Sequence, residues 1–186
     1  MRRRRWLDAL LGRATVAEPD LDTLFALPPA AAVLGTATGF ASAGLAGVGF
    51  RAAEGRAFAG VHRQAGDLLG EREEIKDAYD YTWFLARDPS ADELVKRVHG
   101  VNSTLEDAGF GPSLLCSAFR FESRGRGLLV VYLYKRGTFY PFAPLDGHRR
   151  DTVLEDRAAE ALRPELPVEP DRARWFALWD IPALTR

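Results

Sequence analysis

The chain has 186 residues, of which 47% are hydrophobic and 11% aromatic, so it can bury a core as one domain and is too apolar for a disordered chain. Its net charge at pH 7 is −1, but residues 2–13 hold five arginines and one aspartate, which leaves 20 basic and 25 acidic residues elsewhere. A mildly acidic body with a basic head argues against a general nucleic-acid binder.

Cysteine content and hydropathy bear on the cellular compartment. Cys116 is the single cysteine, so no disulfide can form within the chain, as in proteins of a reducing compartment. No run of about 18 consecutive apolar residues predicts a membrane-spanning helix. The apolar part of the N-terminus, 6–11, contains Asp8 and is shorter than a signal-peptide core of about 7–15 residues. The sequence therefore predicts a cytoplasmic protein.

The N-terminus predicts a basic amphipathic head over residues 1–13, followed by a linker over 14–19 and a single domain over 20–186. Apolar residues on one helical face follow four arginines. Such a helix can lie in the headgroup layer of an anionic membrane. Packing on the domain or on a partner protein, and simple disorder, are the alternatives. The candidate membrane or partner contacts are Arg2, Arg3, Arg4, Arg5, Trp6, Leu7, Leu10 and Leu11.

The next segment predicts a short helix and a hairpin. Asp20 can cap a helix through Leu27, which the following two prolines would end. Ala30–Phe40 and Val48–Ala53 read as two strands, with a turn-like stretch at Ser42–Gly47 between them. The glycines here match neither a P-loop nor a G-x-G-x-x-G pattern, so we interpret them as turn and bulge residues.

Helical spacing of apolar residues then predicts a helix over 56–69. The charged stretch Glu71–Asp77 reads as a loop. Tyr79–Arg87 alternates as a strand does.

A second helix begins at a capping-box signature, in which Ser90 is followed three residues later by Glu93. Apolar residues recur on one face of this helix up to Gly109, where the pattern ends. This is the most clearly marked helix of the chain.

The most apolar stretch begins with Leu128–Lys135, which fits a strand covered on both faces. Leu114–Glu122 reads as its hairpin partner across Ser123–Gly127. Cys116 lies inside that partner strand, where a buried, inert thiol is the expectation. Phe139–Leu145 continues as an extended cover.

Asp151–Leu162 predicts the last helix, and the tail 168–182 gathers four large apolar side chains. These are Trp175, Phe176, Leu178 and Trp179, which we expect to seal a core edge or to offer a partner patch. The element order predicts an α+β fold: a mostly antiparallel sheet of about five strands with helices packed on one face, and an N-terminal amphipathic helix.

No catalytic motif is legible. The three histidines, His62, His99 and His148, lack the spacing of metal ligands, and no serine sits in a G-x-S-x-G elbow. We therefore predict no enzyme, no cofactor and no metal. One polar group is suggestive, because Lys135, Arg136 and Tyr140, with Arg149 and Arg150 downstream, can gather into an anion- or partner-binding edge. The alternative is a solvated strand end with ordinary surface charges.

Several stretches together resemble the PspA-associated protein PspAB family. They are W-L-D-A-L-L-G-R (6–13), L-D-T-L-F-A-L-P (21–28), Y-D-Y-T-W (79–83), V-N-S-T-L-E-D-A-G-F-G-P-S-L-L-C (101–116), Y-L-Y-K-R-G-T-F-Y-P-F-A-P (132–144) and L-P-V-E-P-D (166–171). The likeness spans nearly the whole chain, although the run Arg2–Arg5 is unusual for the family.

The resemblance implies a bacterial cytoplasmic accessory of the phage-shock, or envelope-stress, system. The implied partner is PspA, the coiled-coil protein that coats stressed inner membranes, and no catalytic residues come with the family. The first hypothesis is thus a non-enzymatic adaptor that binds PspA or a membrane-proximal partner, in the cytoplasm or peripherally at the inner membrane face. The alternative is a small-ligand or anion-binding domain that uses the edge formed by Lys135, Arg136 and Tyr140.

Overall fold

The structure of this chain is a computed structural model, which describes residues 19–70, 73–179 and 181–185. The strands are β1 (Ala41–Phe50), β2 (Glu73–Lys76), β3 (Thr82–Arg87), β4 (Leu114–Ser123), β5 (Arg126–Leu133), β6 (Thr138–Phe142), β7 (Pro144–Leu145) and β8 (Arg149–Arg150). The α-helices are α2 (Leu27–Thr38), α3 (Arg56–Asp67), α4 (Ala91–Leu105), α5 (Thr152–Leu162) and α6 (Pro182–Thr185). Short helical turns are η1 (Leu21–Ala26), η2 (Glu106–Phe110), η3 (Gly111–Ser113), η4 (Tyr134–Arg136) and η5 (Arg172–Arg174).

Six strands form one sheet in the order β2-β3-β1-β4-β5-β6, and every neighbouring pair is antiparallel. The strands β7 and β8 form a separate small hairpin. The prediction of an α+β fold with an antiparallel sheet is therefore confirmed, with six strands in the main sheet where about five were expected.

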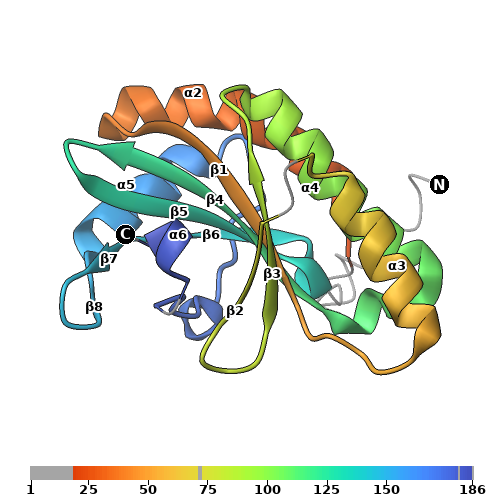
Figure 1. The fold of residues 1–186 in the computed structure, drawn as a ribbon. Coiled ribbons are helices and arrows are strands. Elements are labelled where there is room, and N and C mark those ends of the chain that lie inside the picture. Colours follow the sequence, from red (N-terminus) through yellow and green to blue (C-terminus); the bar gives the residue numbers. More distant parts are fainter. Residues whose placement is uncertain (1–18, 71–72, 180, 186) are drawn as a thin grey trace, which may run out of the picture.

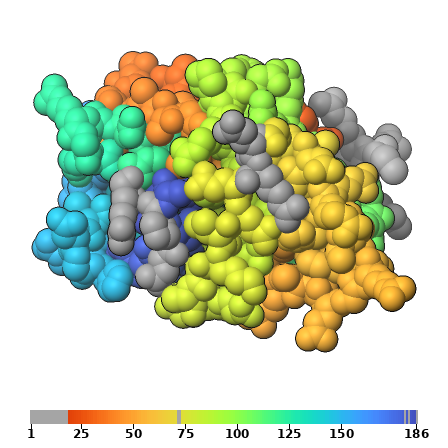
Figure 2. Space-filling model, viewed as in Figure 1, coloured from red at the N-terminus to blue at the C-terminus, as the bar shows by residue number. Residues whose placement is uncertain are grey.

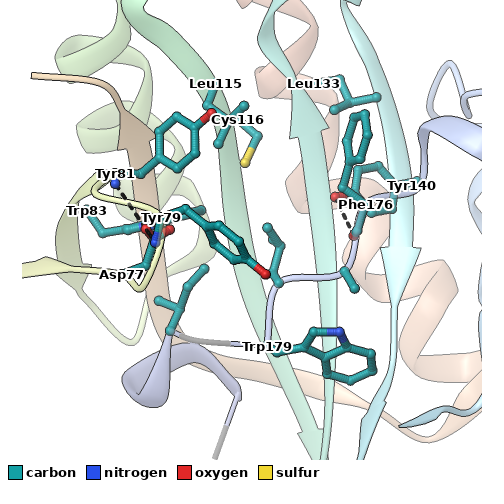
Figure 3. Close-up of a pocket in the computed structure, with 13 residues that line it drawn as sticks. Asp77, Tyr79, Tyr81, Trp83, Leu115, Cys116, Leu133, Tyr140, Phe176 and Trp179 are labelled. Atoms are coloured by element: carbon teal, nitrogen blue, oxygen red, sulfur yellow. Dashed lines mark hydrogen bonds between the residues drawn. The ribbon is translucent and has the colours of Figure 1, made fainter. Parts of the chain in front are cut away.

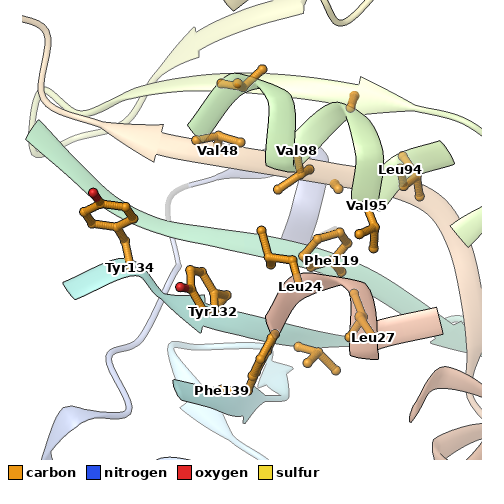
Figure 4. Packing of buried hydrophobic residues seen from close by; sticks show 14 of the residues in the cluster. Leu24, Leu27, Val48, Leu94, Val95, Val98, Phe119, Tyr132, Tyr134 and Phe139 are labelled. Atoms are coloured by element: carbon orange, nitrogen blue, oxygen red, sulfur yellow. The ribbon is translucent and has the colours of Figure 1, made fainter. Parts of the chain in front are cut away.

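The helices α2, α3, α4 and α5 lie on one face of this sheet (Figure 1). The helix α4 packs on β1 and β3, α3 packs on α4, and α2 lies between α4 and α5. Alternate residues of the strands point into this layer, as the twofold period of a strand requires. Figure 4 shows part of this layer from close by, with Val98 of α4 and Leu24 of η1 near Phe119 of the sheet, all three buried.

The intervening strand residues point to the opposite face, where the C-terminal tail covers them. Trp83, Leu129 and Val131 belong to this second core, which Trp175 and Leu184 of the tail complete. The tail runs between the β7–β8 hairpin and the β2–β3 hairpin (Figure 2). The sequence predicted a covering layer on one face of the sheet only, and the tail adds a second layer on the other face. This second layer makes β5 a strand that is covered on both faces, as its apolar run predicted.

The predicted strand Ala30–Phe40 is wrong, because α2 occupies this stretch. Pro28 and Pro29 begin this helix instead of ending the preceding one, since they fall in its first turn, where backbone N–H groups have no helical partner. The helix ends at Gly39, whose φ of 77° is the left-handed conformation common at helix C-termini.

The helical stretch Leu21–Thr38 is long and apolar enough to cross a membrane by length and composition alone. Its leucines pack inside the protein, however. Leu24, Leu27 and Leu34 are buried in the core shared with α4 and α5. We therefore interpret the stretch as a helix that packs its leucine face on the core, with 28% of its residues buried.

The predicted turn at Ser42–Gly47 is also wrong, because β1 runs through it from Ala41 to Phe50. Gly47 and Gly49 leave room for the indole of Trp83 on the adjacent strand, since a Cβ atom at Gly49 would lie 2.8 Å from two ring carbons. Glycines that suggest a turn in the sequence serve here as a packing surface inside a strand.

The charged stretch predicted as a loop contains a strand, β2, which pairs with β3 as the edge of the sheet. The predicted strand Tyr79–Arg87 is correct only from Thr82 onward. The residues before it form the connection between β2 and β3. Alternating exposure of β2 agrees with an edge strand, whose charged side chains protect it from pairing with other chains.

The locally encoded elements are confirmed. The helix predicted over 56–69 is α3, and the Asp151–Leu162 helix is α5, with Asp151 accepting a hydrogen bond from the Leu154 N–H. The hairpin of β4 and β5 turns at Arg124 and Gly125, whose φ values of 48° and 77° are both positive, as a type I′ turn requires.

Replacing Ser90 with alanine is expected to lower the free energy of unfolding by about 1 kcal/mol, because its hydroxyl caps α4 by accepting a hydrogen bond from the Glu93 N–H at 3.4 Å. Urea-induced unfolding measures the change. Thr36→Ala is the matched control, since Thr36 is exposed within α2 and caps nothing. An equal loss in both variants would contradict the capping role.

Candidate functional site

A cavity of about 280 Å³ opens on the second face of the sheet, between the β2–β3 connection and the C-terminal tail. Its lining is almost entirely apolar, and side chains from β3, β4, β5, β6 and the tail converge on it (Figure 3). Figure 3 shows the Cys116 sulfur and Tyr81 on one side and Leu133, Tyr140 and Phe176 on the other, with Trp179 below. We refer to this cavity as the aromatic pocket.

One wall of the aromatic pocket is set by the carboxylate of Asp77. Its Oδ1 accepts hydrogen bonds from the backbone N–H groups of Tyr79 at 2.9 Å and Tyr81 at 3.0 Å. Its Oδ2 accepts one from the indole Nε1 of Trp83 at 2.9 Å. These three bonds fold the β2–β3 connection into a turn that brings both tyrosines to the pocket, and they engage both oxygens of the carboxylate.

The tail forms the opposite wall, and specific hydrogen bonds fix its backbone. The hydroxyl of Tyr140 donates to the carbonyl of Phe176 at 3.0 Å, and Nη1 of Arg150 donates to the carbonyl of Trp175 at 2.6 Å. The indole of Trp175 donates to the carbonyl of Glu169 at 3.0 Å. Burial raises the pKa of Tyr140 well above 10, so this hydroxyl stays a neutral donor.

Cys116 lies at the base of the aromatic pocket and is 2% exposed. Burial, followed by the negative charge of Asp77, raises the pKa of its thiol to about 12. The thiol is therefore protonated at neutral pH, and a protonated thiol is a poor nucleophile. The burial predicted for Cys116 is confirmed, and the chemistry that this pocket offers is the binding of an apolar group.

Two of the five residues of the predicted anion edge are neutralised by buried carboxylates. Arg136 Nε lies 2.5 Å from Oε2 of Glu169, whose side chain is fully buried. Arg150 Nε lies 2.9 Å from Oε1 of Glu155, whose side chain is 1% exposed. These pairs hold two different segments in place, the tail for Glu169 and α5 for Glu155.

The remaining three residues also lie in separate surroundings. Tyr140 belongs to the aromatic pocket, whereas Lys135 borders an open depression beside Glu106. Arg149 is exposed, and its Nε donates to the backbone carbonyl of Asp146 at 3.1 Å. The five side chains do not line one cavity, so the anion edge stays a prediction that now rests on Lys135 and Arg149.

The predicted membrane or partner contacts, Arg2 to Leu11, lie outside the described residues. Within the described ranges no group of three or more His, Cys, Asp or Glu side chains is arranged to hold a metal ion. The histidines have separate neighbours: His62 packs among Phe50 and Phe84, and His99 lies 3.4 Å from Asp22.

The sequence did not identify the aromatic pocket as a site. Its signals were visible, since Tyr79, Tyr81 and Trp83 alternate on one side of a strand and the tail holds four large apolar residues. Their meeting across about 100 residues of chain is a product of the fold. Asp77 was assigned to a charged loop, and its part in building the pocket wall becomes evident only from its three donors.

Comparison with known proteins gave one match. A family model described as PspAB, PspA associated protein B, matches residues 4–183 of the chain. A search of curated proteins and a search of solved structures found no match.

Proposed function

The chain belongs to the PspAB (PspA associated protein B) family, and from this premise we propose that it is a non-enzymatic adaptor that binds PspA in the envelope-stress response. The observation that carries the proposal is the extent of the match, 4–183, which includes the basic head from residue 4, the sheet and the pocket-forming tail. The match therefore supports a PspA-linked role for the chain as a whole.

The chemistry of the aromatic pocket supports binding over catalysis. Its carboxylate, Asp77, is occupied by three N–H donors, and its thiol, Cys116, is neutral at physiological pH. A general base or nucleophile needs a free lone pair at working pH, with a partner group in reach. The thiol does not meet that requirement, and the carboxylate already holds three donors in the pocket wall, so we propose that the protein works by presenting surfaces.

We further propose that the protein acts in the cytoplasm at the inner membrane face, where its basic head meets anionic lipid or PspA itself. Four consecutive arginines precede Trp6, and each basic residue near an anionic surface contributes about 1 kcal/mol of attraction. PspA, as the coiled-coil partner implied by the family resemblance, would bring the adaptor to the same surface.

Changing Arg2, Arg3, Arg4 and Arg5 together to glutamine is expected to weaken sedimentation with phosphatidylglycerol vesicles at least tenfold at low salt. Changing the same four residues to lysine is the matched control, because it conserves the charge and should retain binding. Raising the salt concentration should weaken vesicle binding of the native protein to the level of the glutamine variant, since salt screens the attraction between arginine and lipid charges.

Association with PspA is tested by pull-down with the full chain and with a chain lacking residues 1–13. Capture by both chains assigns PspA binding to the folded domain, and capture by the full chain alone assigns it to the head. The adaptor proposal is contradicted if neither chain captures PspA and deletion of the head changes no vesicle binding.

A further inference from the structure

The aromatic pocket disfavours a polar occupant in its interior, because the buried nitrogen and oxygen atoms of its lining side chains are already bonded within the protein. The carboxylate of Asp77 has three donors, and the indole N–H of Trp83 is one of them. The hydroxyl proton of Tyr140 is directed to the carbonyl of Phe176. A polar occupant would lose its hydrogen bonds to water without replacement, which costs about 1–3 kcal/mol for each group.

Water in the interior of the pocket is poorly held for the same reason, because a buried water needs about two to four polar partners. Apolar cavities of about 150 Å³ in other proteins stay dry and bind small hydrocarbons. The aromatic pocket, at about 280 Å³, is larger. At about the volume of one liquid water, roughly 30 Å³, per methylene group, it holds an alkyl chain of about nine or ten carbons.

The positively charged side chain of Arg51 lies beside the pocket, next to Tyr81. The guanidinium carbon of Arg51 lies 5.1 Å from the centre of the Tyr81 ring, and its Nη2 lies 3.5 Å from the Tyr81 hydroxyl. Arg51 is exposed, and among the described residues its guanidinium contacts Tyr81. An anionic group at the end of an apolar chain in the pocket can therefore pair with it.

The rim of the pocket presents apolar surface to the outside. Tyr79 is 68% exposed and Phe176 is 56% exposed, and both line the pocket. They come from its opposite walls, the β2–β3 connection and the tail. Exposed aromatic side chains around a cavity mark a site where an apolar molecule enters.

We propose that the aromatic pocket binds an acyl chain of about ten carbons, with the anionic end of the ligand facing Arg51. This lipid-binding site is independent of PspA association, so either can fail without the other. Free fatty acid and the acyl chain of a phospholipid share this chemistry, and the experiment separates the two sources.

Isothermal titration calorimetry of the full chain with sodium hexanoate, octanoate, decanoate and tetradecanoate tests the size argument, with each acid below its micelle concentration. Affinity is expected to rise by up to about fourfold per added methylene as far as decanoate. From decanoate to tetradecanoate the rise per methylene should stop, because the pocket is full. Absence of binding, or affinity that keeps rising at the same rate through tetradecanoate, would overturn the proposal.

Ala177→Trp tests the location. Ala177 is exposed and lines the pocket, so the larger side chain blocks it from the mouth, and decanoate binding should weaken at least tenfold. Ala173→Trp is the matched control on the same tail, also exposed and away from the pocket, and should bind as the native chain does. Equal binding by both variants would place the ligand elsewhere and reject the site.

Arg51→Gln tests the orientation. It should weaken decanoate binding about twofold to fivefold, the range of an exposed ion pair, and leave decanol binding unchanged. Arg63→Gln, at an exposed position of α3, is the control for net charge and should change neither affinity. An equal effect of Arg51→Gln on the acid and the alcohol would reject the orientation.

Binding of three ligands distinguishes a free acid from a phospholipid as the source of the acyl chain. They are decanoate, ten-carbon lysophosphatidylglycerol and phosphatidylglycerol vesicles. Decanoate binding that Ala177→Trp abolishes identifies a free acid. Binding of the lysolipid or vesicles alone, with the same sensitivity, identifies a lipid-held chain. Vesicle binding alone that depends on Arg2–Arg5 and ignores Ala177→Trp belongs to the head and overturns the pocket proposal.

Discussion

Replacing Trp83 with alanine is expected to lower the free energy of unfolding by about 3–5 kcal/mol, the range for removing a large buried aromatic side chain. Trp83 is fully buried in β3, and its ring lies against Gly47 and Gly49 of β1. The substitution leaves a cavity and also removes the Nε1 donor of Asp77. Urea-induced unfolding followed by circular dichroism measures the loss.

The fit between Trp83 and Gly49 can be tested separately. Gly49→Ala places a methyl group 2.8 Å from ring carbons of Trp83 and should cost about 1–3 kcal/mol by overpacking. In a Trp83→Leu background the same substitution should cost less, with a coupling energy of about 0.5–3 kcal/mol. Strictly additive effects would contradict direct packing between the two residues.

Gly60→Ala is the control for the glycine effect itself. Gly60 lies inside α3, and an added Cβ would meet no atom within 4 Å. The same chemical change should therefore stabilise the protein by about 0.5–1 kcal/mol, because alanine is the better helix former. The expected loss of stability at Gly49 and gain at Gly60 distinguish a steric requirement for glycine from the general effect of glycine on the backbone.

Replacing Glu169 with alanine is expected to lower the free energy of unfolding by about 2–4 kcal/mol, somewhat less than for a fully buried ion pair. The side chain of Glu169 is fully buried, whereas Arg136 is 31% exposed and can turn partly to water. Glu169 accepts hydrogen bonds from Arg136, from Thr138 at 2.9 Å and from the Asp171 N–H at 3.1 Å.

The position of Glu169 explains why this loss should extend to the aromatic pocket. The Phe139 N–H donates to the carbonyl of Pro167 at 2.8 Å, and the Glu169 N–H donates to the carbonyl of Phe139 at 2.7 Å, so the tail is bound to β6 at this point. The indole of Trp175, six residues further along the tail, donates to the Glu169 carbonyl. Glu169→Ala should therefore raise the amide hydrogen-exchange rate of the tail more than that of the helices.

The exposed pair of Asp156 and Arg172 is the matched control, because both side chains are more than half exposed. Asp156→Ala should change stability by less than about 1 kcal/mol. Similar losses in Asp156→Ala and Glu169→Ala would mean that burial of Glu169 is not the source of its effect.

Glu169 also makes stability depend on pH. Burial alone would raise its pKa, but hydrogen bonds from Arg136, the Asp171 N–H and Thr138 outweigh burial and hold the pKa below the ordinary value of 4.5. The stabilisation is therefore complete above about pH 4.5 and is lost as the pH falls through the lowered pKa of the folded state. The native chain should lose stability more steeply than Glu169→Gln as the pH falls below 4.5.

Much of the fold was predictable because its signals are local. The Ser90 cap of α4, the Asp151 cap of α5 and the positive-φ turn at Arg124 and Gly125 each act within a few residues. The apolar run of β5 likewise predicted a strand covered on both faces. The resemblance to the PspAB family, read from motifs along the chain, is confirmed by the family match.

The three errors in secondary structure come from residues whose meaning depends on distant partners. The stretch 30–50 is rich in alanine and glycine, whose small side chains give little hydrophobic periodicity, and packing of α2 against α5 and of β1 against Trp83 decided between helix and strand. The stretch 73–76 is too short and charged to read as a strand without β3 beside it.

The candidate site shows the same division. The sequence by itself determined the fold class, the capped helices, the central hairpin and the family, because hydrophobic period and turn chemistry are written in neighbouring residues. Only the tertiary structure decided that Arg136 and Arg150 neutralise buried carboxylates and that Tyr79 meets Phe176 across a cavity. Whether two charges pair, and whether side chains enclose a cavity, depends on which residues are close in space. Separation along the chain does not reveal this.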